Sequence, residues 1–217
     1  IVGLLEGKVA IITGAGSGVG KEHSLLLASE GASVVVNDLG ESAEQTVSEI
    51  IELGGTAVSH SGNVADWNTG EDLVQKAINE FGDMHILINN AGILRDAMSF
   101  SMTEQEFDEV IAVHLKGHFV CARAAAVYWR NQAKAGISAP RRMVHTTSES
   151  GLFGGPAQSA HYHEPTNIIP KPSFWIFFDH FRDRCTAGAF TGIPLKGGIG
   201  ISICWDHGLS LSSFGRY

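Results

Sequence analysis

The sequence predicts an α/β fold built on a doubly wound parallel sheet, with an atypical C-terminal part. Over residues 8–147, short apolar runs alternate with segments whose apolar residues have helical spacing. A glycine-rich stretch, residues 13–20 (TGAGSGVG), joins the first run to the first helical segment. Strict alternation of strands and helices implies parallel strands with right-handed crossovers, so that helices cover both sheet faces. Together these features predict a Rossmann-like arrangement.

The first three predicted strands and the first two helices are separated by glycine. Residues 8–13 (KVAIIT) form an apolar run, and residues 33–37 (SVVVN) form a short β-branched one, so both predict buried strands. The helices predicted over residues 18–30 and 41–53 each stop at glycine, which commonly ends a helix. Residues 56–60 predict a weak third strand.

The second half of this region predicts two helices and two strands, over residues 69–81, 84–89, 103–134 and 141–147 in chain order. Thr103 is a suitable N-cap for the longer helix, because Glu106 follows at the spacing of a capping box. Phe107, His114 and Leu115 lie on one apolar stripe of that helix. A single long helix ending near residue 134 is therefore expected.

The segment after residue 158 has a different composition. Four of the six prolines lie there, and they interrupt the stretch where a helix should follow the fifth strand. No amphipathic helix or further strand is recognisable. We therefore expect a dinucleotide-binding domain over residues 1–158 and an atypical segment, not a separate domain, over residues 159–217. His161 and His163 have a zinc-like spacing but no second ligand cluster, so no metal site is predicted.

The composition of the whole chain excludes several classes of function. Its 217 residues are 44% hydrophobic and 18% charged, as in ordinary globular proteins. The net charge of -8 argues against a nucleic-acid partner, and the apolar runs are too short to predict a membrane segment. Three scattered cysteines and no targeting sequence predict a cytoplasmic protein. The chain begins with Ile rather than Met, which suits a fragment or a processed chain.

The glycine-rich stretch has the features of a phosphate-binding loop. Backbone N–H groups at a helix N-terminus attract anions, and glycines let a pyrophosphate approach closely. A Walker A motif does not fit, because Ala15 stands where its first glycine belongs and Glu22 follows Gly20-Lys21. The spacing is T-G-x-x-x-G-x-G. A tight strand-to-helix turn without a ligand is the alternative.

Asp38 ends the second predicted strand, 24 residues after Gly14. A carboxylate there can accept hydrogen bonds from ribose hydroxyls, and it repels the 2′-phosphate of NADP. Ser17, within the loop, offers no positive charge for that phosphate. Asp38 and Ser17 therefore favour NAD as the cofactor, with an ordinary turn aspartate as the alternative reading.

These motifs together resemble the short-chain dehydrogenase/reductase family. The resemblance rests on TGAGSGVG, on NDLG at residues 37–40 and on NNAG at residues 89–92. Three longer stretches, NNAGILRD (89–96), VHLKGHF (113–119) and SGLFG (150–154), resemble one subgroup. This subgroup is the (3R)-hydroxyacyl-CoA dehydrogenase unit of peroxisomal multifunctional enzyme type 2 and its bacterial relatives. The resemblance covers about residues 3–160.

The resemblance implies roles for particular residues. Those implied to bind the cofactor are Thr13, Gly14, Ser17, Gly18, Val19, Gly20, Asp38, Leu39, Asn63, Val64, Asn90, Ala91 and Gly92. Ser148 matches the serine that orients the substrate, and Tyr162 is the candidate general acid/base. His114 stands where the family has its active-site Asn, although its place on the apolar stripe equally suits a core histidine.

One part of the family pattern is missing. The family pairs its tyrosine with a lysine four residues later, but Thr166 stands there, and Lys171 is nine residues after Tyr162. A phenol with its ordinary pKa of about 10 needs a nearby cation to act as a base at neutral pH. Three explanations remain open: an altered reading frame near residue 159, a divergent substrate region in which Lys171 folds back, or a non-catalytic relative.

The sequence thus predicts an NAD-dependent oxidoreductase that moves a hydride between nicotinamide and a secondary alcohol or ketone. A 3-hydroxyacyl thioester is the favoured small-molecule substrate because of the resemblance. The alternative is a relative that binds nucleotide without turnover. Family members assemble through the long fourth helix, so a homo-oligomer through residues 103–134 is expected, with no nucleic-acid or membrane partner.

Overall fold

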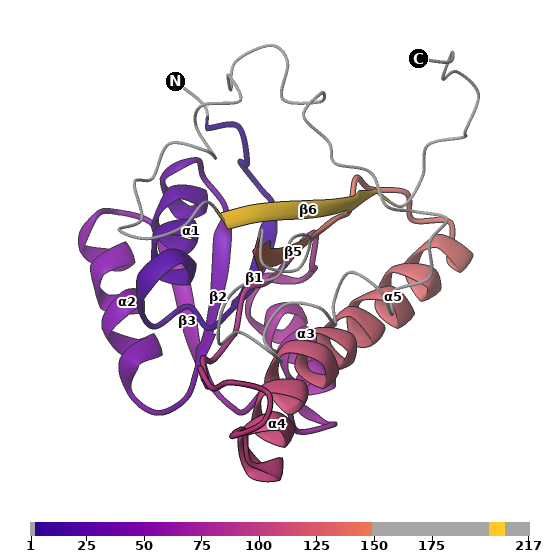
Figure 1. Cartoon of the computed structure of the whole chain (residues 1–217). Coiled ribbons are helices and arrows are strands. Elements are labelled where there is room, and N and C mark those ends of the chain that lie inside the picture. The colour runs from indigo at the N-terminus through magenta and orange to yellow at the C-terminus, as the bar shows by residue number, and fades with distance from the viewer. Residues whose placement is uncertain (1–2, 149–199, 207–217) are drawn as a thin grey trace, which may run out of the picture.

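A six-stranded sheet forms the centre of the computed structural model, which describes residues 3–148 and 200–206 (Figure 1). The strand order is β3-β2-β1-β4-β5-β6. The strands are β1 (Val9–Thr13), β2 (Ser33–Asp38), β3 (Thr56–Ser61), β4 (Ile86–Asn89), β5 (Arg142–Ser148) and β6 (Gly200–Asp206). The first five strands pair parallel with one another, so the predicted fold class is confirmed.

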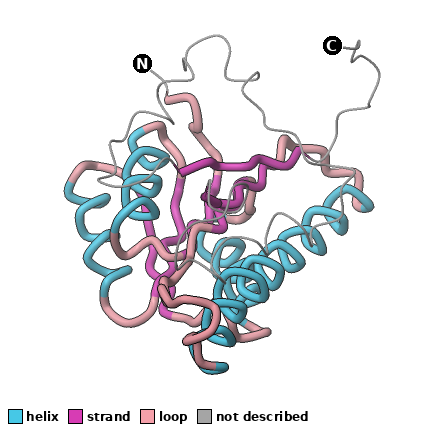
Figure 2. The backbone as a smooth tube through the Cα atoms, in the orientation of Figure 1, coloured by secondary structure: helices cyan, strands magenta, loops and turns pink. Residues whose placement is uncertain are grey.

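Helices cover both faces of the sheet (Figure 2). The helical elements are α1 (Gly18–Ser29), α2 (Ser42–Glu52), α3 (Thr69–Phe81), α4 (Glu104–Val110), η1 (Ile111–Gly117) and α5 (His118–Lys134). Successive residues of a strand point to opposite faces. Ile12 accordingly packs in a core with residues of α1 and α2, whereas its neighbour Ile11 packs in a second core with α3 and α5.

The strand order places a cleft at a predictable point of the sheet. β1 has β2 on one side and β4 on the other, so the connections from it run in opposite directions. Ligands of open parallel sheets bind at such a reversal, beyond the carboxyl ends of the strands. Thr13, Asp38 and Asn89 end the three strands that meet there.

The predicted long helix is continuous but not uniform. Thr103 forms the expected capping box, because its hydroxyl accepts the Glu106 N–H and the Glu106 carboxylate accepts the Thr103 N–H. A seven-residue π-helical stretch, η1, separates α4 from α5. The expectation of one regular α-helix is therefore wrong over residues 111–117. Such π-helical turns frequently occur at functional sites.

The same helical run, Glu104–Lys134, is the one segment of the described chain that is long and apolar enough to cross a membrane. A helix from the core of a folded domain satisfies the same criteria of length and composition. This run packs on α3 and β4, and Val120, Ala125 and Trp129 are among its buried residues.

The sixth strand corrects the expectation that no strand follows residue 159. β6 pairs antiparallel with β5, with Gly200 opposite Ser148 and Asp206 opposite Arg142. The sequence of this strand, GISICWD, alternates apolar and polar residues, which is the pattern of a strand with two different faces. The alternating segment is short, and its partner strand β5 lies far away in the chain. For these reasons the sequence alone did not predict β6.

Candidate functional site

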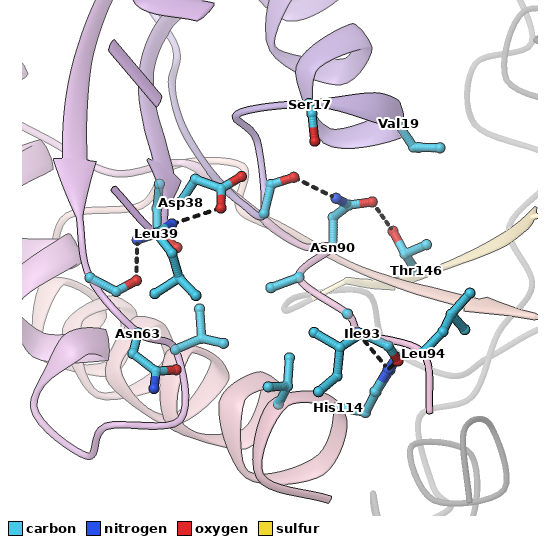
Figure 3. Close-up of a pocket in the computed structure, with 17 residues that line it drawn as sticks. Ser17, Val19, Asp38, Leu39, Asn63, Asn90, Ile93, Leu94, His114 and Thr146 are labelled. Atoms are coloured by element: carbon cyan, nitrogen blue, oxygen red, sulfur yellow. Dashed lines mark hydrogen bonds between the residues drawn. The ribbon is translucent and has the colours of Figure 1, made fainter. Parts of the chain in front are cut away.

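A cavity of about 400 Å³ lies at the carboxyl ends of β1, β2, β4 and β5 (Figure 3). Most of the residues that the sequence implied for cofactor binding line it, namely Gly14, Ser17, Val19, Asp38, Leu39, Asn63, Val64, Asn90, Ala91 and Gly92. His114 lines it as well. Thr13, Gly18 and Gly20 do not line the cavity but shape the backbone around it.

The glycine-rich loop lines the cavity with Gly14 and Ser17, just before helix α1 begins. Gly14 and Gly18 have φ values of 62° and 55°, which favour glycine because other residues are strained there. Helix α1 starts at Gly18, and its N-cap residue Ser17 makes no side-chain capping hydrogen bond. The first turn contains no acidic residue. The N-terminus of α1 is therefore suited to an external anion such as a pyrophosphate.

Close packing fixes this loop against the end of β4. A Cβ on Gly14 would lie 2.7 Å from the Ala91 Cα, and a Cβ on Gly20 would lie 2.6 Å from the Asn90 Nδ2. Both distances are shorter than van der Waals contact, so each position requires glycine. Two glycines implied by the motif thus act through packing.

Asn90 and Thr13 connect three strands beneath the cavity. The Asn90 Nδ2 donates to the carbonyl oxygens of Thr13 (3.2 Å) and Gly14 (3.1 Å), and the Thr146 hydroxyl donates to the Asn90 Oδ1 (3.1 Å; Figure 3). The Thr13 hydroxyl accepts the backbone N–H groups of Asn90 and Ala91. These bonds hold the loop, the end of β4 and β5 in one arrangement.

Asp38 serves the loop and still has capacity for a ligand. Its Oδ2 accepts the Gly16 N–H at 2.7 Å, and its Oδ1 accepts the Leu39 N–H at 2.7 Å. A carboxylate can accept about four hydrogen bonds, so these two leave room for ribose hydroxyls. The carboxylate therefore lies where the sequence placed it, and it also orients the glycine-rich loop.

Asn63 and Val64 form the turn after β3. The Asn63 Oδ1 accepts the Ala65 N–H (3.0 Å), and the Thr69 hydroxyl donates to the Asn63 carbonyl oxygen (2.7 Å). Val64 is buried, and a Cβ on Gly117 of η1 would lie 2.7 Å from its Cγ2. The turn is thus fixed by its own bonds and by the π-helical stretch beside it.

His114 is both a buried residue and a cavity residue. It lies in η1 with 6% of its surface exposed. Its Nε2 is 2.8 Å from the Ile93 carbonyl oxygen and 3.1 Å from the Ile93 nitrogen. A Cβ on Gly92 would lie 2.7 Å from the His114 Cε1. The ring therefore holds the segment that follows β4 at the edge of the cavity.

Two further histidines, His118 and His145, form a buried pair beside Ala91, and the sequence did not predict this pair. The His118 Nε2 is 3.2 Å from the Ala91 carbonyl oxygen, and the two Nδ1 atoms are 3.4 Å apart. Burial and the neighbouring histidines lower the pKa of His118 to about 3, and burial lowers that of His145 to about 4. Both rings are neutral at neutral pH.

Sequence reasoning also missed several residues that line the cavity, namely Asn37, Gly62, Ile93, Leu94, Val113 and Thr146. Ile93 and Leu94 stand within the NNAGILRD stretch, and Thr146 stands two positions before Ser148. The place of Ile93 and Leu94 in that motif was a signal that could have identified them, whereas Thr146 stands outside the quoted motifs. Ser148 is the last residue of β5, and Tyr162 lies outside the described residues.

Over residues 3–148, no group of three His, Cys, Asp or Glu residues is arranged to hold a metal ion.

Comparisons with known proteins agree with this geometry. A family model described as short chain dehydrogenase matches residues 8–162. The chain is 45% identical over 166 residues to hydroxyacyl-CoA dehydrogenase ChsB1 of Mycobacterium tuberculosis, a match that covers 73% of this chain and 52% of that protein. It thus spans about half the length of this relative.

Two further matches also cover most of this chain and only part of the other protein. The chain is 42% identical over 159 residues to peroxisomal multifunctional enzyme type 2 of Drosophila melanogaster, covering 69% of this chain and 25% of that enzyme. A crystal structure of a short chain dehydrogenase from Mycobacterium avium superposes with a TM-score of 0.73 at 46% identity. That match covers 74% of this chain and 61% of the other.

Proposed function

This chain belongs to the short-chain dehydrogenase family, and from that premise we propose that it is an NAD-dependent oxidoreductase acting on a secondary alcohol or ketone. The observation that supports this most is the pairing of two features in one cavity. The α1 N-terminus, which has no side-chain cap, contributes Ser17 and Val19 to the cavity lining, and Asp38 lines the same cavity. The first suits a pyrophosphate and the second suits an adenosine ribose.

The charge of the cavity supports NAD over NADP. Among the described residues that line it there is no Lys or Arg, and Asp38 is the acidic one. A 2′-phosphate on the ribose would bring negative charge toward that carboxylate without a cation to offset it. Ser17, on the glycine-rich loop, supplies only a hydroxyl.

Replacing Asp38 tests this cofactor proposal. In Asp38→Asn we expect NAD affinity to fall about tenfold or more, because hydrogen bonds to a charged group contribute roughly 1.5–3 kcal/mol. NADP affinity should fall less or rise, because the repulsion is gone. Calorimetric titration of both dinucleotides measures this, with the exposed Glu41→Gln as a control beside the site. Equal affinity of the unaltered protein for NAD and NADP would contradict the proposal.

A 3-hydroxyacyl thioester is the substrate class that we propose. One relative supports it by name, the hydroxyacyl-CoA dehydrogenase of Mycobacterium tuberculosis. NAD, when bound, would accept a hydride from the carbinol carbon, so that the alcohol becomes a ketone. Ser148 would orient the substrate oxygen, and Tyr162 would remove the hydroxyl proton.

The alternative is a relative that binds nucleotide without turnover, and the absence of a lysine four residues after Tyr162 favours it. A turnover measurement distinguishes the two. With NAD and a 3-hydroxyacyl-CoA we expect absorbance at 340 nm to rise as NADH forms. Tyr162→Phe should lower kcat at least a hundredfold, within the usual contribution of general acid/base catalysis. NAD binding without any rise in absorbance would favour the nucleotide-binding relative. Turnover that Tyr162→Phe leaves intact would contradict the role proposed for Tyr162.

A further inference from the structure

We propose that Arg95 and Glu109 form a positioning pair that holds one wall of the cavity, residues 93–94, against the α4–η1 helical run. The proposal rests on the proposed function for its effect on the substrate. The attachment itself is a property of the described residues alone. Neither residue is among the described residues that line the cavity, and the sequence motifs gave neither a role.

The wall belongs to the connection between β4 and α4. Gly92, Ile93 and Leu94 all line the cavity, whereas Arg95, the next residue, does not. Farther along, residues 98–102 are held by local turn bonds from Ser101 N–H and Met102 N–H to the Met98 carbonyl oxygen. Those turn bonds tie the connection to itself.

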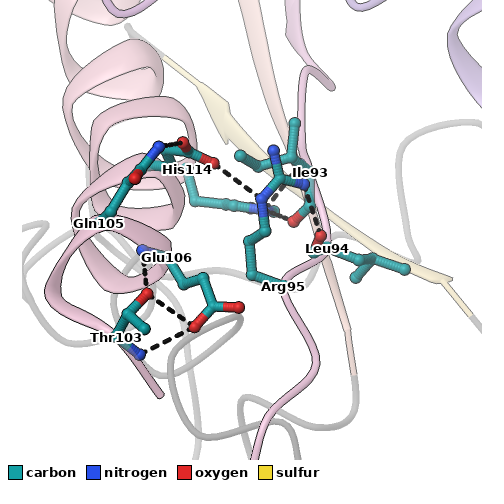
Figure 4. Close-up of polar contacts among 8 residues, drawn as sticks. Ile93, Leu94, Arg95, Thr103, Gln105, Glu106 and His114 are labelled. Carbon is teal, nitrogen blue, oxygen red and sulfur yellow. Dashed lines mark hydrogen bonds and ion pairs between the residues drawn. The ribbon is translucent and has the colours of Figure 1, made fainter.

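The Arg95 side chain donates one hydrogen bond to helix α4 and another to the wall. Its Nε donates to the Glu109 Oε2 at 2.7 Å, and its Nη1 donates to the Leu94 carbonyl oxygen at 2.8 Å (Figure 4). The planar guanidinium can make both bonds at once because its donors have a fixed geometry. The wall residue Leu94 is thereby connected through Arg95 to helix α4.

Glu109 is prepared for this contact by its own helix. The Gln105 Nε2, one turn earlier, donates to the Glu109 Oε1 at 2.9 Å, which leaves Oε2 for Arg95. Hydrogen bonds from Gln105 and then Arg95 lower the pKa of Glu109, so the carboxylate stays ionised. Both oxygens of Glu109 are therefore engaged in one orientation.

His114 provides the second attachment of the same wall. Its Nε2 contacts both backbone groups of Ile93 (Figure 4), and Gly92 packs on its ring. His114 is buried, whereas the side chains of Arg95 and Glu109 are 41% and 35% exposed. The wall is thus fixed at an inner point by His114 and at an outer point by the ion pair.

An exposed ion pair contributes little to global stability, so its loss should change the position of the wall without unfolding the domain. Position is what catalysis depends on, since a displacement of about 1 Å can cost up to a hundredfold in rate. The pair should therefore affect substrate more than cofactor, because the cofactor loop is held separately by Asp38 and Asn90.

Hydrogen–deuterium exchange tests the attachment directly, without cofactor or substrate. In Glu109→Gln, which keeps the size of the side chain, we expect exchange of residues 93–102 to accelerate at least threefold while that of β1 and β4 is unchanged. Arg95→Met should do the same, and the double variant should exchange no faster than either single one. Lys76→Met is the matched control, because it removes an exposed ion pair with Glu80 on α3, away from the cavity.

Steady-state kinetics with a 3-hydroxyacyl-CoA test the effect of the ion pair on the substrate. We expect Glu109→Gln to raise KM at least threefold while the dissociation constant of NAD stays within twofold. Unchanged exchange in Glu109→Gln, or additive effects in the double variant, would overturn the attachment. Faster exchange with an unchanged KM would overturn the role toward substrate. If the unaltered protein shows no turnover, the proposed function fails, while the exchange result still decides the attachment.

Discussion

Lowering the pH from 7 to 5 should cost the folded protein about 4 kcal/mol of unfolding free energy through His118 and His145 alone. Burial lowers their pKa values to about 3 and about 4 in the fold, whereas an unfolded histidine has a pKa of about 6.5. At pH 5 the unfolded chain therefore binds a proton at each histidine and the folded chain binds almost none. Each contributes about 2 kcal/mol.

The direction of this effect follows from the surroundings of the two rings. A proton on His118 would place a positive charge 3.4 Å from the Nδ1 of His145, within a site that excludes water. The other side chain that contacts the His145 Nδ1, the Asn89 amide at 3.5 Å, carries no negative charge. Stability is thus greatest above pH 6.5 and falls as the pH drops toward the folded pKa values.

Urea denaturation at pH 7 and pH 5 measures this loss. In His118→Gln, which keeps a donor for the Ala91 carbonyl oxygen, the difference between the two pH values should shrink by about 2 kcal/mol. His23, His60 and His85 also have pKa values lowered by burial, so they add to the same slope in both proteins. A loss below about 1 kcal/mol, or an equal loss in His118→Gln, would contradict the assignment to this pair.

The sequence predicted the fold well where the signals are local. The helix expected over residues 69–81 has those bounds in the structure, because its apolar spacing and the glycine that follows it are contained in one segment. The strand expected from residue 84 begins at Ile86, where pairing with Ala10 starts. Met84 and His85 are buried before the first residue of the strand, and the His85 backbone already bonds to Val9 and Arg142. An apolar pattern therefore cannot locate the first residue of the strand.

The errors arose where distant residues decide the structure. The seven residues of η1 are too few for the apolar stripe to distinguish a π-helical from an α-helical period. The contacts that accompany η1, His114 with Ile93 and Gly117 with Val64, join it to other elements. β6 likewise depends on a partner, β5, that lies far away in the chain.

In the candidate site, too, residues carried by local motifs were predictable, and residues brought in by distant pairing were not. The glycine-rich loop and Asp38 were predictable because a backbone motif and one strand end carry them. Thr146 reaches the site only because β4 and β5 are parallel and in register, with Asn89 opposite His145. The same register brings His145 to His118, so the histidine pair could be found only once the sheet had been assembled.

Removing the charge of Asp83 should destabilise the protein by about 3 kcal/mol or more, as breaking a buried ion pair commonly does. The Asp83 Oδ1 accepts from the Arg141 Nη1 at 2.6 Å and from the Tyr128 hydroxyl at 2.7 Å. The Arg141 side chain is 5% exposed, and its guanidinium lies 5.7 Å from the centre of the Tyr128 ring. The Arg141 Nη1 also donates to the Met84 carbonyl oxygen, but that oxygen carries no full charge.

Asp83→Asn is therefore the decisive variant, because it keeps the shape of the side chain and leaves a buried guanidinium without a counter-ion. Arg141→Met should cost less. The carboxylate that it leaves is 28% exposed and can reach water. Guanidinium chloride denaturation of the single variants and of the Asp83→Asn, Arg141→Met double variant measures the order, with the exposed Arg123→Met, which removes an ion pair with Glu71, as the control.

The double variant separates two physical accounts of this pair. If the cost of Asp83→Asn comes from an uncompensated buried charge, adding Arg141→Met removes that charge and should restore part of the stability. If the cost comes only from lost attraction, adding Arg141→Met can restore nothing. Partial burial opposes the charge of Asp83, but hydrogen bonds from Arg141 and Tyr128 outweigh it and hold the pKa of Asp83 below its ordinary value, so the carboxylate is ionised at neutral pH. A double variant less stable than Asp83→Asn would show that packing of the Arg141 stem against Tyr128 matters more than its charge.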